Sequence, residues 1–100
     1  MMQYELELPE DYTWEDIQPL LEGQAQRSGF ELGSRSSLQT VPGSSHWHAT
    51  RGEGSGTLEF THDPEASCLI VSVHDDRRGE WAGDAAPAVA TALLRHLRAG

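Results

Sequence analysis

Two histidines and a glutamate are the residues of this chain whose types and spacing best suit chemistry. His46 and His48 flank Trp47 in a segment with the pattern of a β-strand. Alternate residues of a strand share a face, so the two histidine Cα atoms are expected about 7 Å apart. Glu59 lies in the next strand-like segment, and the pairing derived below sets it opposite His48, about 5 Å away. We therefore expect the three side chains on one face of a sheet.

Such a set has three interpretations. Two imidazoles and one carboxylate can form a facial metal-binding triad, and an imidazole beside a carboxylate can act as an acid/base pair. The third interpretation, a cross-strand contact on a polar sheet face, is the one we favour from the sequence. We predict no catalytic residue and no cofactor. A triad of Ser37, His48 and Glu59 would lack a strained nucleophile turn and an oxyanion donor.

The remaining histidines and the single cysteine are predicted to have no chemical role. His62 is expected at the surface beside a turn, His74 lies too far along its strand from the row of His48, and His96 falls on the last helix. Cys68 excludes an intrachain disulfide and a cysteine-based zinc site, because it has no second cysteine to pair with. Its apolar neighbours indicate a small buried hydrophobe.

The charge balance narrows the range of partners. Sixteen acidic residues against seven basic ones give a net charge of −9. That charge repels phosphate backbones and anionic lipid surfaces, so we expect neither nucleic-acid nor membrane binding. No apolar run approaches the ~18 residues that would span a bilayer. The first residues lack the basic and apolar regions of a signal peptide, and the expected location is cytoplasmic.

Hydrophobic periodicity predicts one strand and two helices outside the centre of the chain. Residues 3–8 alternate as in a half-buried strand. Thr13, with Asp16 three residues later, predicts a capping box that opens a helix over residues 13–28, and Gly29 is expected to end it. A second helix is predicted over residues 84–99, with Asp84 as N-cap and Pro87 in the first turn.

The centre of the chain predicts four strands joined by three turns, whose registers can be derived. A two-residue Pro42-Gly43 turn sets Leu38 opposite Trp47 and Ser37 opposite His48. A two-residue Glu53-Gly54 turn then sets Trp47 opposite Phe60 and His48 opposite Glu59. A four-residue loop over residues 63–66 sets Phe60 opposite Leu69 and Leu58 opposite Val71. A slip of one residue would reverse the faces, so these registers can be tested.

The three registers together predict one apolar and one polar face, as expected for an antiparallel sheet with one covered side. Both amphipathic helices should cover the apolar face, which Phe30 and Leu32 extend. The apolar face is predicted to hold Leu38, Trp47, Ala49, Leu58, Phe60, Leu69 and Val71. The polar face is predicted to hold Arg35, Ser37, Gln39, His46, His48, Thr50, Thr57, Glu59, Thr61, Cys68, Ile70 and Ser72.

The predicted fold is thus one α+β domain over residues 1–100, in the order β-α-β-β-β-β-α. This element order resembles the helix-grip and TATA-box-binding-like architectures, which implies a bent antiparallel sheet packed against helices. We expect a non-enzymatic module that binds a protein partner or its own copy. The alternatives are the metal or acid/base site and a small-ligand site between the sheet and the C-terminal helix. The binding surface is predicted to comprise Arg35, Ser37, His46, His48, Glu59 and Ile70.

Overall fold

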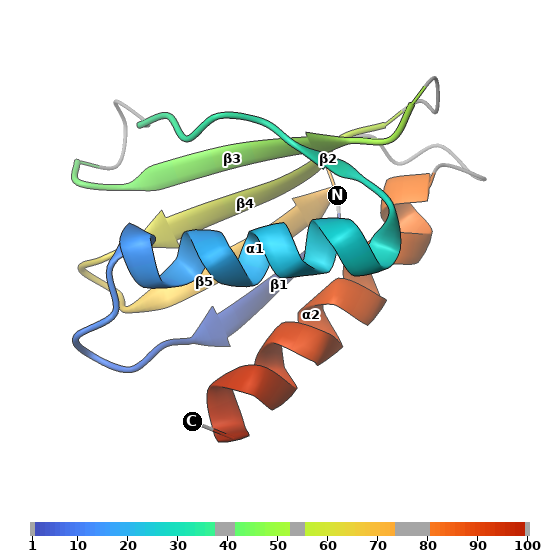
Figure 1. The fold of residues 1–100 in the computed structure, drawn as a ribbon. Helices are drawn as coiled ribbons and strands as arrows, with labels where there is room; N and C mark the ends of the chain where they lie inside the picture. The colour runs from blue at the N-terminus through green and yellow to red at the C-terminus, as the bar shows by residue number, and fades with distance from the viewer. Residues whose placement is uncertain (1, 38–41, 53–55, 74–80, 100) are drawn as a thin grey trace.

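The computed structural model places two helices on one face of a five-stranded antiparallel sheet (Figure 1). It describes residues 2–37, 42–52, 56–73 and 81–99. The elements are β1 (Met2–Glu7), α1 (Trp14–Ser28), β2 (Glu31–Leu32), β3 (Ser45–Thr50), β4 (Leu58–Asp63), β5 (Cys68–Val73) and α2 (Trp81–Ala99). The sheet order is β1-β5-β4-β3-β2. The predicted α+β class and element order are confirmed, and the first strand lies at one edge, beside β5.

Helix α1 begins and ends where its caps require. The Thr13 side chain accepts a hydrogen bond from the Glu15 N–H, and the Asp16 carboxylate accepts one from the Thr13 N–H, so the predicted capping box is present. Gly29 ends the helix with φ 72°, a left-handed conformation that glycine adopts without steric cost. Ile17 and Leu21 are fully buried against the sheet.

Helix α2 begins three residues before the predicted start, at Trp81. Asp84 is therefore a first-turn residue and not the N-cap, and Pro87 lies beyond the first turn. The buried Trp81 indole, which donates to the Gly56 carbonyl at 3.2 Å, anchors this additional turn. Pro87 lacks the N–H of an ordinary helical residue, so the helix has no i→i−4 hydrogen bond from this position. Neither described helix is long and apolar enough to cross a membrane.

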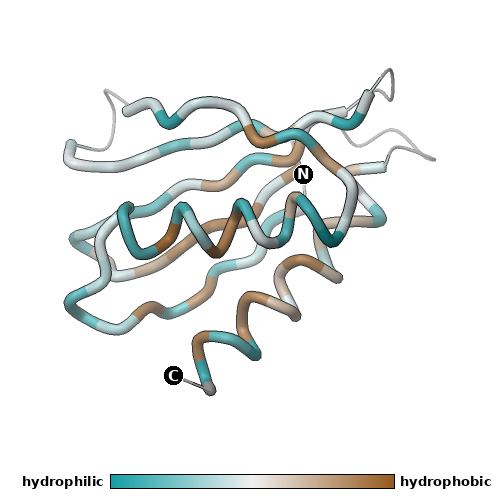
Figure 2. The backbone as a smooth tube through the Cα atoms, in the orientation of Figure 1, coloured by the Kyte–Doolittle hydropathy of each residue, from teal (hydrophilic) through white to brown (hydrophobic). Residues whose placement is uncertain are grey.

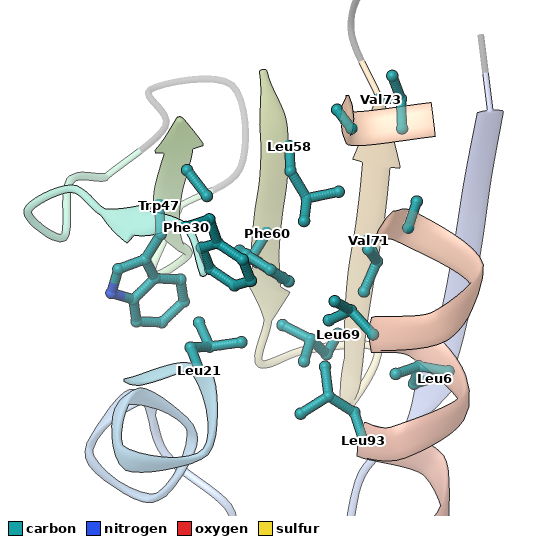
Figure 3. Packing of buried hydrophobic residues seen from close by; sticks show 14 of the residues in the cluster. Leu6, Leu21, Phe30, Trp47, Leu58, Phe60, Leu69, Val71, Val73 and Leu93 are labelled. Carbon is teal, nitrogen blue, oxygen red and sulfur yellow. The ribbon is translucent and has the colours of Figure 1, made fainter. Parts of the chain in front are cut away.

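The core lies between the sheet and the two helices (Figure 3). Trp47 and Phe60 project from adjacent strands toward Leu21 of α1, while α2 contributes residues such as Leu93. Phe30 stacks on Phe60 at 6.2 Å between ring centroids. Hydrophobic and hydrophilic segments alternate along the helices (Figure 2), as expected when one side of each packs on the sheet.

Two of the three predicted hairpins keep their predicted faces. In the second, Trp47 pairs with Phe60 and His48 with Glu59, as expected. In the third, Phe60 pairs with Val71 and not with Leu69, a register two residues away from the prediction. The loop occupies residues 64–67, because the Asp63 carboxylate accepts hydrogen bonds from the N–H groups of residues 65 and 66. An even shift leaves every side chain on its predicted face.

The predicted register of the first hairpin is wrong. Ser36 bridges to His46, and Leu32 pairs with Ala49, whereas the prediction set Ser37 opposite His48. Three residues between Leu32 and Ser36 face two residues of β3, which is the count of a β-bulge. The Pro42-Gly43 turn alone therefore does not close this hairpin. The predicted partners Leu38 and Gln39 and the Glu53-Gly54 turn lie outside the described residues.

His62 is buried, contrary to the surface position predicted for it. It alternates with Phe60 along β4, so its side chain lies on the helix-covered face, opposite Ser45 and Leu69, and only 4% of it is exposed. The sequence argument placed His62 by its nearness to the turn and overlooked this alternation. Burial lowers the pKa of His62 from 6.5, and the nearby Asp63 carboxylate opposes that shift only in part.

The lowered pKa of His62 predicts a pH-dependent stability. The unfolded chain binds a proton at this imidazole more readily than the native protein does, so the free energy of unfolding should fall as the pH drops through the unfolded value of 6.5. We expect His62→Leu to lose less stability than the parent between about pH 7.5 and about pH 5 in urea titrations. Equal losses in both proteins would contradict this assignment.

Candidate functional site

The three residues singled out from the sequence converge on the sheet face opposite the helices. His46 and His48 project from β3, and Glu59 projects from the adjacent β4. Between the two histidines, Trp47 points the other way and is 1% exposed, opposite the fully buried Phe60. The core pair therefore sets the orientation of the cluster, because moving the histidines to the other face would expose the indole.

The three ligand-type atoms form a nearly equilateral triangle. Glu59 Oε1 lies 3.0 Å from His46 Nε2 and 3.0 Å from His48 Nε2. The two Nε2 atoms are themselves 3.1 Å apart. Each of the three residues offers one ligand atom, and the three atoms lie close together. Among the described residues, this is the group of three histidine, cysteine or carboxylate side chains that could hold a metal ion.

Protons alone leave one edge of this triangle without an attractive interaction. If both imidazoles carry a proton on Nε2, both donate to Glu59 Oε1, and the His46–His48 edge joins two donors. If either ring carries its proton on Nδ1 instead, its Nε2 lone pair faces the carboxylate oxygen. A cation that caps the triangle from one side of its plane attracts the lone pairs of all three atoms at once.

The edge lengths match the face of a coordination octahedron. Ligands at right angles around an ion, at bonds of about 2.1–2.2 Å, are separated by about 3.0–3.1 Å, because the edge is √2 times the bond. The observed edges are 3.0, 3.0 and 3.1 Å. Tetrahedral zinc, with bonds of about 2.0–2.1 Å, needs edges of about 3.3–3.4 Å, an opening of about 0.3 Å.

Thr61 supports the orientation of His46. It pairs with His46 across the strands, and its Oγ1 lies 2.7 Å from His46 Nδ1. Metal-ligating histidines usually donate their second ring N–H to an oxygen, which holds the ring in place and increases the basicity of the ligand nitrogen. The sequence prediction placed Thr61 on the polar face without giving it a role. The confirmed register of the second hairpin was the signal that could have found it.

Burial divides the cluster into a fixed and an accessible part. The side chains of His46 and Glu59 are 9% and 11% exposed, whereas that of His48 is 59% exposed. His48 is therefore the member of the cluster that solvent reaches.

Two residues predicted to flank the cluster lie elsewhere. The Arg35 guanidinium lies 3.9 Å from the centroid of the Trp14 ring and donates to Ser45 Oγ, so it packs toward α1 on the helix-covered side. Its predicted place on the polar face is wrong. The first hairpin is shifted by three residues, an odd number, which exchanges the two faces. It brings Ser36 opposite His46, where the prediction set Gln39 opposite His46 and Ser37 opposite His48.

The remaining residues considered in the sequence analysis lie outside the cluster. Ile70 lies on the same face as His46 but one strand beyond Thr61, with which it pairs. Cys68 is half-buried; burial raises the pKa of its thiol, and the Asp63 and Glu5 carboxylates raise it further, which disfavours the reactive thiolate. His96 is exposed on α2. His74 lies outside the described residues.

The fold and the cluster together define an α+β domain with helices on one sheet face and a His-His-Glu cluster on the other. Comparison with protein-family models, with curated proteins and with solved structures finds no match. The function is therefore inferred from the geometry of the cluster.

Proposed function

We propose that this domain binds one divalent transition-metal ion through His46 Nε2, His48 Nε2 and Glu59 Oε1. The observation that supports the proposal is the triangle of 3.0, 3.0 and 3.1 Å between these atoms. Two neutral imidazoles and one carboxylate hold a divalent ion with a residual charge of +1. Three adjacent coordination positions remain for water or another ligand.

The ligand set favours particular metals. Imidazole nitrogen suits iron, cobalt, nickel, copper and zinc, whereas calcium and magnesium prefer sites made of oxygen alone. The near right-angle geometry suits a six-coordinate ion such as Fe²⁺, Co²⁺ or Ni²⁺ without rearrangement. Zinc requires the small opening described above, which the exposed His48 can provide.

The metal proposal is better supported than the interpretations favoured from the sequence. The predicted protein-binding surface loses Arg35 and the Ser37 pairing, and the cluster that remains has the geometry of a ligand set. A small ligand enclosed beneath the buried side of α2 is disfavoured by packing, because Ala86, Val89 and Leu93 are at most 1% exposed. The hollows beside α2 lie at the β1 edge of the sheet. A protein partner remains a prediction for another surface, argued in the next subsection.

A direct titration tests the proposal. We expect the full chain, freed of metal by chelation, to bind one equivalent of Co²⁺, Ni²⁺ or Zn²⁺ in native mass spectrometry and calorimetry. At free metal 100 times the Kd, binding should stabilise the fold by about 2.7 kcal/mol. For a chain of this size, that corresponds to a rise in Tm on the order of 10 °C. The weak or strong visible absorption of bound Co²⁺ reports six or four ligands.

The double variant His46→Ala/His48→Ala is the control for this titration. It should bind none of the three ions stoichiometrically and should show no rise in Tm. The proposal is overturned if the parent takes up no metal at millimolar concentration, or if the double variant binds as tightly as the parent.

A further inference from the structure

The edge strand β1 combines three features that favour docking of another strand. Among the residues that the structure describes, its hydrogen-bonded neighbour is β5, on one side (Figure 1). An unpaired edge exposes a row of backbone N–H and C=O groups that can pair with a further strand. Its helix side borders a groove, and its other side carries acidic residues. These features lie away from the His-His-Glu cluster and do not depend on it.

The hydrogen-bond phase of β1 identifies which backbone groups face outward. The Leu8 N–H donates to the Ser67 carbonyl at 2.9 Å, and the strands pair in register from Met2 opposite Val73 onward. In an antiparallel ladder the residues that bond to the neighbour alternate with residues that point away from it. The even-numbered residues of β1 therefore bond to β5. Gln3, Glu5 and Glu7 direct their N–H and C=O groups outward.

The groove beside this edge is lined by apolar residues and by a smaller polar set that includes Arg98 of α2. Tyr4, Leu6 and Leu8 point toward the helix-covered side, and two hollows between β1 and α2 share Leu6 and Leu94 as lining residues. Leu97 lines one of them. A strand added at the edge would project every second side chain over these residues. Apolar side chains at those positions would bury both partners.

The opposite side of the added strand would meet negative charge. Glu5 and Glu7 are exposed and share the outer face of β1 with Gln3. No basic residue precedes Arg27 in the sequence. Directly opposite pairs of like charge destabilise a ladder, and pairs of opposite charge stabilise it. Basic side chains are therefore favoured at the positions that face Glu5 and Glu7.

The same charges argue against a second copy of this chain as the partner. In antiparallel self-pairing, the outward-facing residues must pair with one another. The register that also brings Leu8 opposite Met2 is the longest, and it sets Glu5 opposite Glu5 and Glu7 opposite Gln3. A shift of two residues sets Glu5 opposite Glu7 in one direction and opposite Gln3 in the other. Two of the three registers therefore bring carboxylates together, and the third pairs only residues 2–6.

We propose that β1 docks an extended protein segment in which basic residues alternate with apolar ones, adding a sixth strand to the sheet. The partner's backbone bonds to Gln3, Glu5 and Glu7, its basic side chains face the two glutamates, and its apolar side chains cover the groove beside α2. The net charge of −9 attracts such a segment at long range.

A capped seven-residue peptide that alternates lysine with valine is the probe. We expect it to bind the full chain and to slow the hydrogen exchange of the Gln3, Glu5 and Glu7 amides in NMR. Glu5→Pro should abolish binding but keep the fold, because the Glu5 N–H faces outward and proline is tolerated at a strand edge. Glu5→Lys/Glu7→Lys should weaken binding on the order of tenfold or more.

The matched control is Glu10→Lys/Glu22→Lys, which makes the same change in net charge at two exposed residues outside β1. It should lower the affinity less than the edge variant does. The proposal is overturned if the peptide fails to bind at millimolar concentration, if protection appears elsewhere, or if both double variants bind equally. It is also overturned if sedimentation shows a dimer that protects the three edge amides without peptide.

Discussion

Replacing His48 with alanine is expected to lower the metal affinity of the domain by more than about 100-fold while leaving its stability nearly unchanged. Loss of a residue that only orients a ligand costs about 10–100-fold, and loss of a ligand should cost more. The His48 side chain is 59% exposed, and its removal leaves no cavity in the core. Substitutions at such positions usually change the free energy of unfolding by about 0.5 kcal/mol or less.

A graded series separates coordination from general damage. Thr61→Val removes the oxygen beside His46 Nδ1 but keeps the shape of the side chain, so the affinity should fall by about 10–100-fold. His96→Ala removes an exposed imidazole from α2 and should have no effect. In calorimetric titrations with Zn²⁺ or Ni²⁺, we expect the parent and His96→Ala to have the highest metal affinity, Thr61→Val a lower one and His48→Ala the lowest. Any other order contradicts the assigned roles.

Replacing Trp47 with alanine is expected to reduce the free energy of unfolding by about 3–5 kcal/mol. The indole is 1% exposed, and its Nε1 donates to Gln18 Oε1 of α1 at 3.3 Å. The loss is large because domains of this size are stable by only about 5–15 kcal/mol. The corresponding fall in Tm is on the order of 20 °C. Urea unfolding followed by circular dichroism measures it without relying on tryptophan fluorescence.

Gln18→Ala provides the companion measurement for Trp47. It removes the hydrogen-bond partner but leaves the indole in place, so the cost should be only about 0.5–1.5 kcal/mol. If the two variants lost equal stability, the packing of the indole would not be the main contribution. A loss below about 1 kcal/mol for Trp47→Ala would contradict its place in the core.

The two predictions concern neighbouring residues of one strand with opposite roles. Trp47 and His48 project to opposite faces of β3, so each can be substituted without touching the side chains on the other face. The Trp47 variant, however, should also weaken metal binding, because the indole and its partner Phe60 hold the register of His46, His48 and Glu59. The His48 variant should have no reciprocal effect on the core.

Most of the fold follows from local patterns in the sequence. The capping box at Thr13 and the glycine at residue 29 determine where α1 begins and ends, because they satisfy backbone groups that no distant residue can supply. The alternation of β3 and β4 determines that Trp47 and Phe60 share one face while His48 and Glu59 share the other. These features depend on residues close in sequence or on a period of two, so the sequence alone predicts them.

Only the tertiary structure decided the features that depend on longer loops and on distant partners. A bulge before Ser36 turns Arg35 toward Trp14. The turn after Asp63 pairs Phe60 with Val71, two residues away from the predicted partner. The alternation of a strand shows which residues share a face but does not show how many residues a loop contains. The registers on either side of these loops were therefore not predictable from the sequence.

The same division applies to the candidate site. The sequence by itself determined which three residues face one side of the sheet, because strand alternation is local. The tertiary structure decided that their ligand atoms meet within 3.0–3.1 Å, that Thr61 supports His46 and that His62 is buried. It also decided that β1 lies at the edge. Rotamers, depth and strand order are set by packing between segments far apart in the chain, and packing appears only once the chain has folded.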